Sequence, residues 1–188
     1  CFAYGAHPVF QNWSAHVGAG ATLLLGGDGC GKTTLLRLLA GAFTADAGQL
    51  LLAGVPVAQA AQARPCPVFW QDPRAAPDDT VASAYLTAQA TRWPTWNEAA
   101  AQAHIDGLAL REHIHKPFFA LSTGGRRKVW LTAALASGAP LTLMDEIFAA
   151  LDTPSIRYLT AALQQTADES SDRCLLASHW EPWPGVPE

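Results

Sequence analysis

Short and long apolar segments alternate along the chain. Four short apolar runs have the length and the flanking residues of buried strands: ATLLLGG (21–27), PCPVFWQD (65–72), PLTLMDE (140–146) and RCLLASH (173–179). The stretch KTTLLRLLAGAF (32–43) has leucines at helical spacing and a glycine near its end, which predicts a helix. This alternation of strands and helices predicts an α/β core with a mostly parallel sheet.

A different pattern fills the middle of the chain. Residues 80–92 and 97–113 are rich in Ala, Leu and Gln and follow a helical period, with the turn-like RWPTW between them. We therefore expect one domain over 1–188, in which residues 1–72 and 133–188 form the core and residues 73–132 form a helical insertion. The stretch QLLLAGVPV indicates a strand and a turn.

A glycine-rich loop joins the first predicted strand to the first predicted helix. The sequence GGDGCGKTT fits G-x-x-x-x-G-K-[ST], the phosphate-binding loop of many nucleotide-binding proteins. Glycines let several backbone N–H groups point at one phosphate, and the helix N-terminus adds its positive end. Lys32 is expected to reach the β- and γ-phosphates, and Thr33 to ligate Mg²⁺. The predicted nucleotide-binding residues of this loop are Gly26, Gly27, Asp28, Gly29, Cys30, Gly31, Lys32, Thr33 and Thr34.

Composition narrows the classes of function. The net charge of −4 gives no reason to expect non-specific nucleic-acid binding. No apolar run approaches the ~18 residues that span a bilayer, so we expect a soluble, cytosolic protein. The cysteines are scattered without a C-x-x-C pair, which favours reduced thiols over disulfides or a zinc site: Cys1, Cys30, Cys66 and Cys174. Cys30 is interpreted as a small residue at a variable loop position, with a reactive thiol as the alternative.

Further elements, taken with the loop, resemble the ATPase domain of ABC proteins, the ATP-binding cassette family, over essentially the whole chain. LTLMDEIFAALD resembles the family's Walker B strand and D-loop. This resemblance implies that Asp145 orients Mg²⁺, that Glu146 polarises the attacking water, and that Asp152 lies at a dimer seam. The family usually has Pro where this chain has Ile147. An ordinary acidic strand end is the alternative reading of Asp145 and Glu146.

Two single polar residues at strand ends extend the resemblance. FWQD looks like the Q-loop, in which Gln71 reaches the Mg²⁺ and the water and acts as a hinge for the helical insertion. LASHW ends a strand in His179, which resembles the switch histidine that contacts the γ-phosphate. A structural role is the alternative for each residue. Their positions, thirty-nine residues after Lys32 and thirty-four after Asp145, favour the functional interpretation.

The stretch ALSTGGRRKVWLTAAL is similar to the family signature, which reads L-S-G-G-Q followed by a basic residue and a helix. In one register Ser122 matches the signature Ser, Thr123 replaces the first Gly, Gly124 matches the second and Gly125 replaces Gln. A second register reads Thr123, Gly124 and Gly125 as S-G-G and requires a deletion, so we prefer the first. The resemblance implies that Ser122 and Gly124 cap the γ-phosphate of ATP bound to another protomer. An ordinary helix N-cap is the alternative.

An aromatic residue near the start of the chain completes the comparison. Tyr4 stands twenty-two residues before Gly26, about where the family places the ring that stacks on adenine. Phe2 is a second candidate for that role, and packing alone is the alternative for Tyr4.

The resemblance implies an α/β fold of the P-loop NTPase type: a RecA-like core with a mostly parallel sheet, a small antiparallel β part and an inserted α-helical subdomain. It implies an ATP hydrolase that uses ATP and Mg²⁺ and works as a sandwich dimer with a second ABC subunit, expected to be another copy of this chain. The implied catalytic residues are Glu146, His179, Gln71 and Lys32. The implied metal ligands are Thr33, Gln71 and Asp145.

The family also implies a partner and a place in the cell. In transporters the ATPase lies on the cytoplasmic face of the membrane and binds a transmembrane permease subunit, so we expect a peripheral protein at the inner face. The insertion carries aromatic and proline residues that suggest a groove for that subunit, with core packing as the alternative: Tyr85, Trp93, Trp96, Pro73, Pro77 and Pro94.

Two other functions stay open at this point. A soluble ABC ATPase of DNA repair or translation usually carries two cassettes, long arms or basic surfaces, and this chain has none of these. A regulatory ATP-binding module with weak hydrolysis is favoured only by the altered signature. The intact Lys32, Asp145, Glu146 and His179 argue against it.

Overall fold

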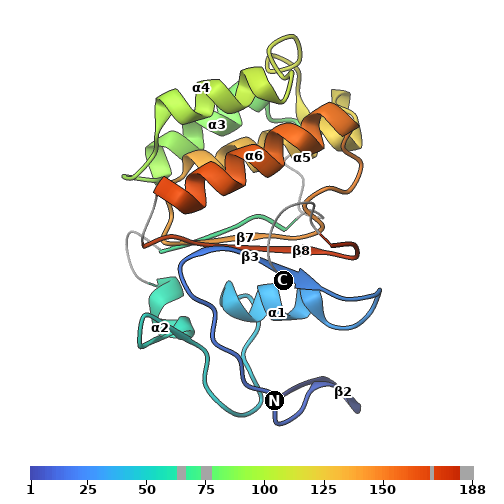
Figure 1. Cartoon of the computed structure of the whole chain (residues 1–188), viewed down its shortest axis with the longest axis vertical. Coiled ribbons are helices and arrows are strands. Elements are labelled where there is room, and N and C mark those ends of the chain that lie inside the picture. The colour runs from blue at the N-terminus through green and yellow to red at the C-terminus, as the bar shows by residue number, and fades with distance from the viewer. Residues whose placement is uncertain (63–66, 73–77, 170–171, 183–188) are drawn as a thin grey trace.

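The computed structural model describes residues 1–62, 67–72, 78–169 and 172–182. Its centre is a four-stranded parallel sheet with the order β3-β8-β7-β6 (Figure 1). These strands are β3 (Gly20–Leu25), β8 (Cys174–His179), β7 (Leu141–Met144) and β6 (Val68–Trp70). The predicted α/β fold with a mostly parallel sheet is confirmed. Cys66, Pro73 and Pro77 lie outside the described residues.

Helices cover both faces of the sheet. The helix α1 (Lys32–Leu39) lies on one face, and α5 (Thr123–Ala136) and α6 (Thr153–Glu169) lie on the other (Figure 1). Every residue of β7 is buried, which explains why that strand reads as a continuous apolar run in the sequence. The helix α6 was not among the predicted elements.

The strand register brings the candidate chemistry to one edge of the sheet. In the parallel pair β3-β8, Leu25 pairs with His179, and in the parallel pair β7-β8, Met144 pairs with Ala177. The phosphate loop leaves β3 after Leu25, and the acidic pair follows directly after Met144. The carboxyl ends of three neighbouring strands therefore carry the loop, the acidic pair and the histidine together, as parallel sheets do at ligand sites.

Two small antiparallel hairpins accompany the sheet, as the family resemblance implied. One consists of β1 (Phe2–Tyr4) and β2 (His7–Phe10), and the other of β4 (Leu51–Leu52) and β5 (Val55–Pro56). The turn between β4 and β5 has positive φ at both residues, 48° and 80°, which suits a two-residue hairpin. A short helix α2 (Val57–Gln62) follows and was not predicted.

The middle of the chain forms α3 (Ala82–Arg92), α4 (Glu98–Gly107) and a short 3₁₀ turn η1 (Phe118–Ala120) before α5. The helix predicted over 97–113 is shorter than expected. The helix α4 ends at Gly107, and the backbone leaves the helical conformation at Ala109, where φ is 53°. A Cβ at position 107 would meet the Tyr158 ring at 2.0 Å, so α6 packs closely on the end of α4. The expected border at 132/133 falls inside α5, and the division into core and insertion stays a prediction.

Polar groups from outside α5 hold its C-terminal end. The Arg173 guanidinium donates to the carbonyls of Ala134 at 3.3 Å and Leu135 at 3.2 Å. The Asn97 N–H donates to the Ala136 carbonyl at 2.8 Å. These bonds satisfy carbonyls that the end of a helix leaves without intrahelical donors, and so they anchor α5 to β8 and to the α3-α4 turn.

The aromatic residues of the middle region are mostly core residues. Tyr85 and Trp93 are only 7% and 3% exposed, and their rings pack against Phe118 at 5.3 Å and Phe69 at 5.6 Å. The interpretation of these two rings as an exposed groove is therefore wrong, because they fill the space between the helices and the sheet. Trp96 is half-buried. Within the described residues, no helix combines the length and the apolarity needed to cross a membrane.

Candidate ATP-binding site

The phosphate loop ends in a glycine, Gly31, that no other residue replaces without strain. Gly31, directly before α1, has a φ of 102°, and a Cβ there would lie 2.7 Å from Cγ1 of Val9. The first helical bond runs from the Leu35 N–H to the Gly31 carbonyl at 2.8 Å. Within the described residues, the N–H groups of Lys32 and Thr33 have no acceptor, so they are available to an anion at this helix N-terminus.

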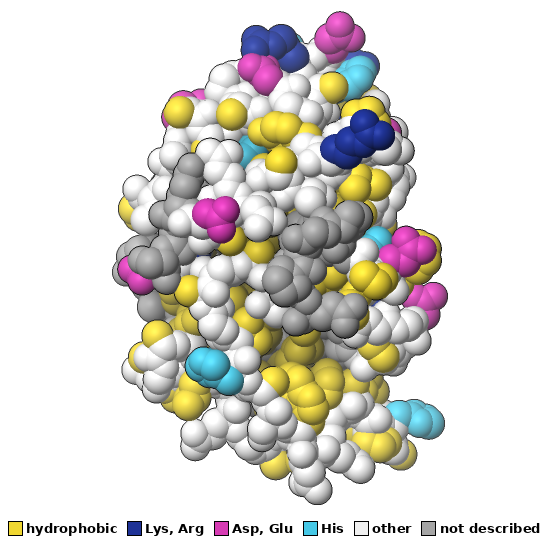
Figure 2. Space-filling view, viewed as in Figure 1, with side chains coloured by type: hydrophobic (Ala, Val, Ile, Leu, Met, Phe, Trp, Pro, Cys, Tyr) yellow, Lys and Arg dark blue, Asp and Glu magenta, His cyan; other side chains and the backbone are white. Residues whose placement is uncertain are grey.

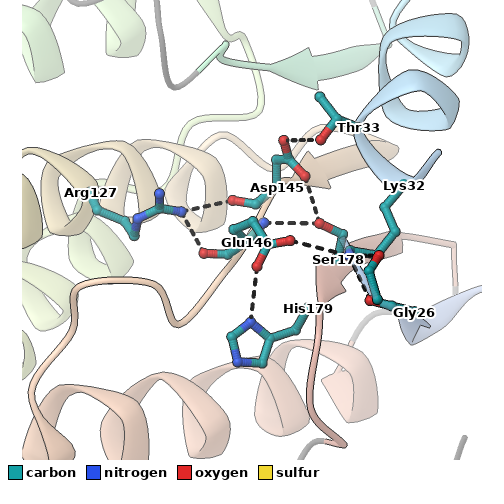
Figure 3. A network of polar contacts seen from close by, with 9 residues as sticks. Gly26, Lys32, Thr33, Arg127, Asp145, Glu146, Ser178 and His179 are labelled. Carbon is teal, nitrogen blue, oxygen red and sulfur yellow. Dashed lines mark hydrogen bonds and ion pairs between the residues drawn. The ribbon is translucent and has the colours of Figure 1, made fainter. Parts of the chain in front are cut away.

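Lys32 folds back over its own loop. Its ammonium donates to the carbonyls of Gly26 at 2.7 Å and Gly27 at 3.2 Å, and it lies 3.4 Å from Oε1 of Glu146 (Figure 3). The Lys32 side chain is 8% exposed. The loop residues from Gly27 to Cys30 are exposed above it.

Asp145, at the end of β7, joins α1 to β8. Its Oδ2 accepts a hydrogen bond from the Thr33 hydroxyl at 2.8 Å, and its Oδ1 accepts one from the Ser178 hydroxyl at 2.6 Å (Figure 3). A hydroxyl and a carboxylate at one point are oxygen ligands of the kind that Mg²⁺ takes. No cluster of three or more His, Cys, Asp or Glu side chains suited to a metal occurs in the described part of the chain. The residues present thus fit a Mg²⁺ that also takes phosphate oxygens and waters.

Glu146 and His179 face each other at the same edge of the sheet. His179 Nδ1 lies 3.4 Å from Oε2 of Glu146, an ion-pair distance without a hydrogen bond within the described residues (Figure 3). His179 is only 6% exposed, and the Phe148 ring contacts its imidazole edge-to-face at 5.2 Å. Glu146 has a φ of 48°, a left-handed backbone conformation that is uncommon for residues other than glycine. The structure therefore brings Lys32, Glu146 and His179 together as the sequence predicted.

Gln71 is bonded to the helical region. Its side-chain oxygen accepts a hydrogen bond from the Tyr85 hydroxyl at 3.2 Å, and its amide nitrogen donates to the Asp72 carbonyl at 3.4 Å. Burial raises the pKa of Tyr85 far above its usual range, so the phenol remains a donor. Gln71 also lines a cavity of about 30 Å³ together with Asp145. The Arg37–Asp72 ion pair at 2.9 Å ties this segment to α1. The metal-binding role of Gln71 stays a prediction.

The signature segment forms the start of α5. The Ser122 hydroxyl accepts a hydrogen bond from the Gly125 N–H at 3.0 Å, which is the N-cap that the alternative reading predicted. A Cβ on Gly124 would lie 2.3 Å from the Ala150 carbonyl oxygen, so only glycine fits there. Within the described residues, no hydrogen bond or ion pair joins 122–125 to 26–34. The roles of Ser122 and Gly124 toward ATP stay predictions.

Tyr4 lies beside the first turn of α1. Its hydroxyl is 3.1 Å from the Thr34 hydroxyl, and the residue is 46% exposed. Phe2, the second candidate, is buried and stacks on Phe43 at 5.6 Å. Tyr4 is therefore the one of the two that presents ring surface to solvent, and its stacking on adenine stays a prediction.

Asp152 has a partner within its own chain. The Lys128 ammonium donates to it at 2.7 Å and the Ser155 N–H at 2.9 Å, and these bonds hold the pKa of Asp152 below its usual range. Its predicted place at a dimer seam is untested.

Two residues that contact Asp145 and Glu146 were not predicted from the sequence. The Ser178 hydroxyl accepts a hydrogen bond from the Glu146 N–H at 2.9 Å in addition to its bond with Asp145. The Arg127 guanidinium donates to the carbonyls of Asp145 at 2.8 Å and Glu146 at 2.5 Å (Figure 3). Ser178 directly precedes the predicted histidine, which is the only local signal for it. Nothing near Arg127 in the sequence points to β7.

The chain is similar to known ATP-binding proteins. The family model described as ABC transporter matches residues 10–149. The chain is 32% identical over 173 residues to the cytochrome c biogenesis ATP-binding export protein CcmA of Pseudomonas putida, which covers 91% of this chain and 82% of that protein. It is 34% identical over 179 residues to the thiamine import ATP-binding protein ThiQ of a Jannaschia species. This match covers 88% of this chain and 75% of that protein.

A solved structure shows the same fold. An ATP-binding subunit of an ABC transporter superposes with a TM-score of 0.78 at 20% identity, over 95% of this chain and 76% of that chain.

Proposed function

Because the chain belongs to the ABC transporter family of ATP-binding proteins, we propose that it hydrolyses MgATP in a head-to-tail dimer and so powers transport through a separate membrane subunit. The observation that carries this proposal is the meeting of the phosphate loop with the carboxylates of Asp145 and Glu146. The family membership supports ATP binding and ATPase activity in general terms. Dimer formation, the dependence on Mg²⁺ and the membrane partner belong to the proposal.

Each residue of the site has a role that its surroundings support. The free N–H groups at the start of α1 and the Lys32 ammonium bind phosphate oxygens. Thr33 and Asp145 would hold a Mg²⁺, and the ion would supply positive charge to the phosphates. Glu146 orients the attacking water and accepts its proton, and His179 lies beside that carboxylate.

The Lys32–Glu146 contact suggests how ATP binding makes the Glu146 carboxylate available as a general base. The Lys32 ammonium lies 3.4 Å from Oε1 of Glu146 and partly neutralises its charge. Phosphate oxygens compete for the same ammonium. Once Lys32 turns to them, the Glu146 carboxylate is free to accept a proton from water.

The proposed dimer is supported by the contacts of the signature segment within its own chain. Ser122 and Gly124 make their contacts within α5 and with the 145–152 segment, and not with the loop at 26–34. Two copies paired head to tail bring each signature segment to the loop of the other copy. The second subunit is proposed to be another copy of this chain.

A membrane partner fits better than nucleic acid. The relatives are named as export and import ATP-binding proteins, so a permease subunit at the inner face of the membrane is the proposed partner, with no direction or substrate assigned. The net charge is −4, and on the described part of the face in Figure 2 the Lys and Arg side chains are few and scattered. A DNA- or ribosome-bound ATPase is therefore the weaker alternative.

Phosphate release from MgATP tests the proposed chemistry. Glu146→Gln keeps the shape of the residue and removes the base, so kcat is expected to fall by about 10²- to 10³-fold while ATP binding persists. Glu112→Gln, at an exposed acidic residue, is the matched control and keeps wild-type kcat. Equal kcat for wild type and Glu146→Gln contradicts the assignment of the base.

Co-purification tests the partner. The tagged protein is recovered with ATP from gently solubilised membranes of its host, and a polytopic membrane protein in stoichiometric amount supports the transporter proposal. Recovery with ribosomes or DNA, or without any partner, contradicts it.

A further inference from the structure

Arg127 is a largely buried cation beside the proposed base, and the roles assigned above do not use it. It lies in the second turn of α5, and its Nη1 donates to the carbonyls of both Asp145 and Glu146 (Figure 3). Both bonds come from this one nitrogen, so a single charged amino group joins the two carbonyls. Arg127 therefore binds the backbone of the acidic pair, whereas Lys32 faces the Glu146 carboxylate.

The backbone at Glu146 needs such support. A left-handed conformation at a residue other than glycine costs about 1 kcal/mol or more, so its surroundings must hold it. Ser178 binds the N–H side, through the Glu146 N–H at 2.9 Å and the Ile147 N–H at 3.0 Å. Arg127 binds the carbonyl side. The two residues together fix the direction in which the Glu146 side chain leaves the backbone.

The start of α5 is tied to the same segment at further points. Gly124 packs against the Ala150 carbonyl so closely that no Cβ fits, and Lys128 pairs with Asp152 at 2.7 Å. The first two turns of α5 thus contact both ends of the 145–152 segment. A shift of the helix N-terminus at Ser122 is expected to move this segment as well.

We propose that Arg127 is a positioning residue that fixes the backbone of Glu146 from α5, so that nucleotide held at the Ser122 end of this helix sets the readiness of the base in the other site of the dimer. This inference rests on the proposed function, because the second nucleotide belongs to the partner copy. Arg127 transmits the position of the signature segment and does not touch the reacting atoms.

The environment of Arg127 shows why other residues replace it poorly. A neutral side chain of another shape leaves the Asp145 carbonyl without its donor, and such an unpaired group is costly. The Glu146 carbonyl keeps the Ala149 N–H, which donates to it at 3.0 Å. Arg127 Nε and Trp130 Nε1 are buried without partners among the described residues, and both residues line the cavity of about 30 Å³. That space is large enough for one water molecule.

Three variants test the positioning role. Arg127→Gln removes the charged donor, Arg127→Lys keeps the charge on an ammonium group, and Arg111→Gln changes an exposed arginine whose partner is Asp106. For Arg127→Gln we expect kcat for ATP to fall by about 10- to 100-fold. The Kd for ATP is expected to change by less than about two-fold, since the phosphate loop is intact. Arg127→Lys recovers part of kcat, and Arg111→Gln matches wild type.

Hydrogen exchange measures the positioning without hydrolysis. The amides of Glu146 and Ile147 are expected to exchange faster in Arg127→Gln than in wild type or Arg111→Gln, because one side of their clamp is gone. Wild-type kcat in Arg127→Gln, unchanged exchange, or a joint loss of kcat and ATP binding overturns the positioning role. A wild-type protein without ATPase activity contradicts the proposed function instead, and the exchange comparison still decides whether Arg127 holds this backbone.

A double-mutant cycle tests the link between the two sites. If Arg127 carries the effect of the signature segment to Glu146, Ser122→Ala lowers kcat by a smaller factor in the Arg127→Gln background than in wild type. Factors that multiply independently overturn the link.

Discussion

The phosphate loop and the signature segment are the two halves of the proposed ATP site. They differ in how many of their expected contacts are made within one chain. The loop half is preassembled: Lys32 lies against Glu146, and Thr33 is bonded to Asp145. In the signature half, the Ser122 hydroxyl makes its one hydrogen bond to a described residue with the Gly125 N–H of the helix that it caps. In the proposed site, one chain therefore supplies the residues that bind the phosphates and the metal, and its signature segment is left to cap the nucleotide of another copy. This difference is the reason for proposing that the site needs a second copy.

The largest effect is expected in the loop half. Gly31→Ala places a methyl group 2.7 Å from Val9 at a φ of 102°, so the free energy of unfolding is expected to fall by about 3 kcal/mol, with loss of ATP binding. Gly18→Ala is the control, because its Cβ meets nothing within 4 Å and its φ is not positive. Urea unfolding and ATP titration measure both changes. A stable Gly31→Ala variant that binds ATP normally shows that the loop half is not preassembled.

A smaller effect on stability is expected at acidic pH. It arises in α4 and α6, among the helices on the side of the signature segment. Burial lowers the pKa of His104 to about 4, and its Nδ1 lies 3.0 Å from the Tyr158 hydroxyl, where α4 meets α6. The unfolded chain takes up this proton below about pH 6.5 and the folded chain only below about pH 4, so stability falls as the pH drops between these values. The expected loss from pH 7 to pH 5 is about 2 kcal/mol.

Urea unfolding at the two pH values measures this loss. His104→Gln is expected to remove it, and His115→Gln, at an exposed histidine, is expected to keep it. A pH dependence that is the same in His104→Gln and wild type rules out His104 as its origin.

The smallest change in stability is expected at the cap itself. Ser122→Ala removes the hydrogen bond to the Gly125 N–H, so the free energy of unfolding falls by about 1 kcal/mol. Thr123→Ala, one residue further along, is the stability control. ATP binding to the loop half of a single chain is expected to persist while kcat decreases, because the cap acts on the nucleotide of the other copy. Loss of ATP binding in Ser122→Ala places the segment in its own chain's site instead.

The elements that were predicted correctly carry local signals. The loop between β3 and α1 has a motif with fixed spacing, and the strands β7 and β8, which lead to Asp145 and His179, are mostly apolar. Because the carboxyl ends of parallel strands lie at one edge of a sheet, these residues come together there.

Other features depend on contacts between distant parts of the chain. Ser178 and Arg127 reach the acidic pair from another strand and from a helix, and no local pattern encodes such bonds. Tyr85 and Trp93 were considered for a surface groove, but the helix packing buries them. The end of α4 at Gly107 depends on the Tyr158 ring, which comes from α6.

The oligomeric state of Glu146→Gln with MgATP tests the central claim most directly, because this variant is expected to bind ATP without consuming it. Light scattering after size exclusion is expected to show a monomer without nucleotide and a dimer with MgATP, and Ser122→Ala in the same background is expected to weaken the dimer. A chain that binds MgATP and stays monomeric over the whole range of protein concentrations contradicts the shared site.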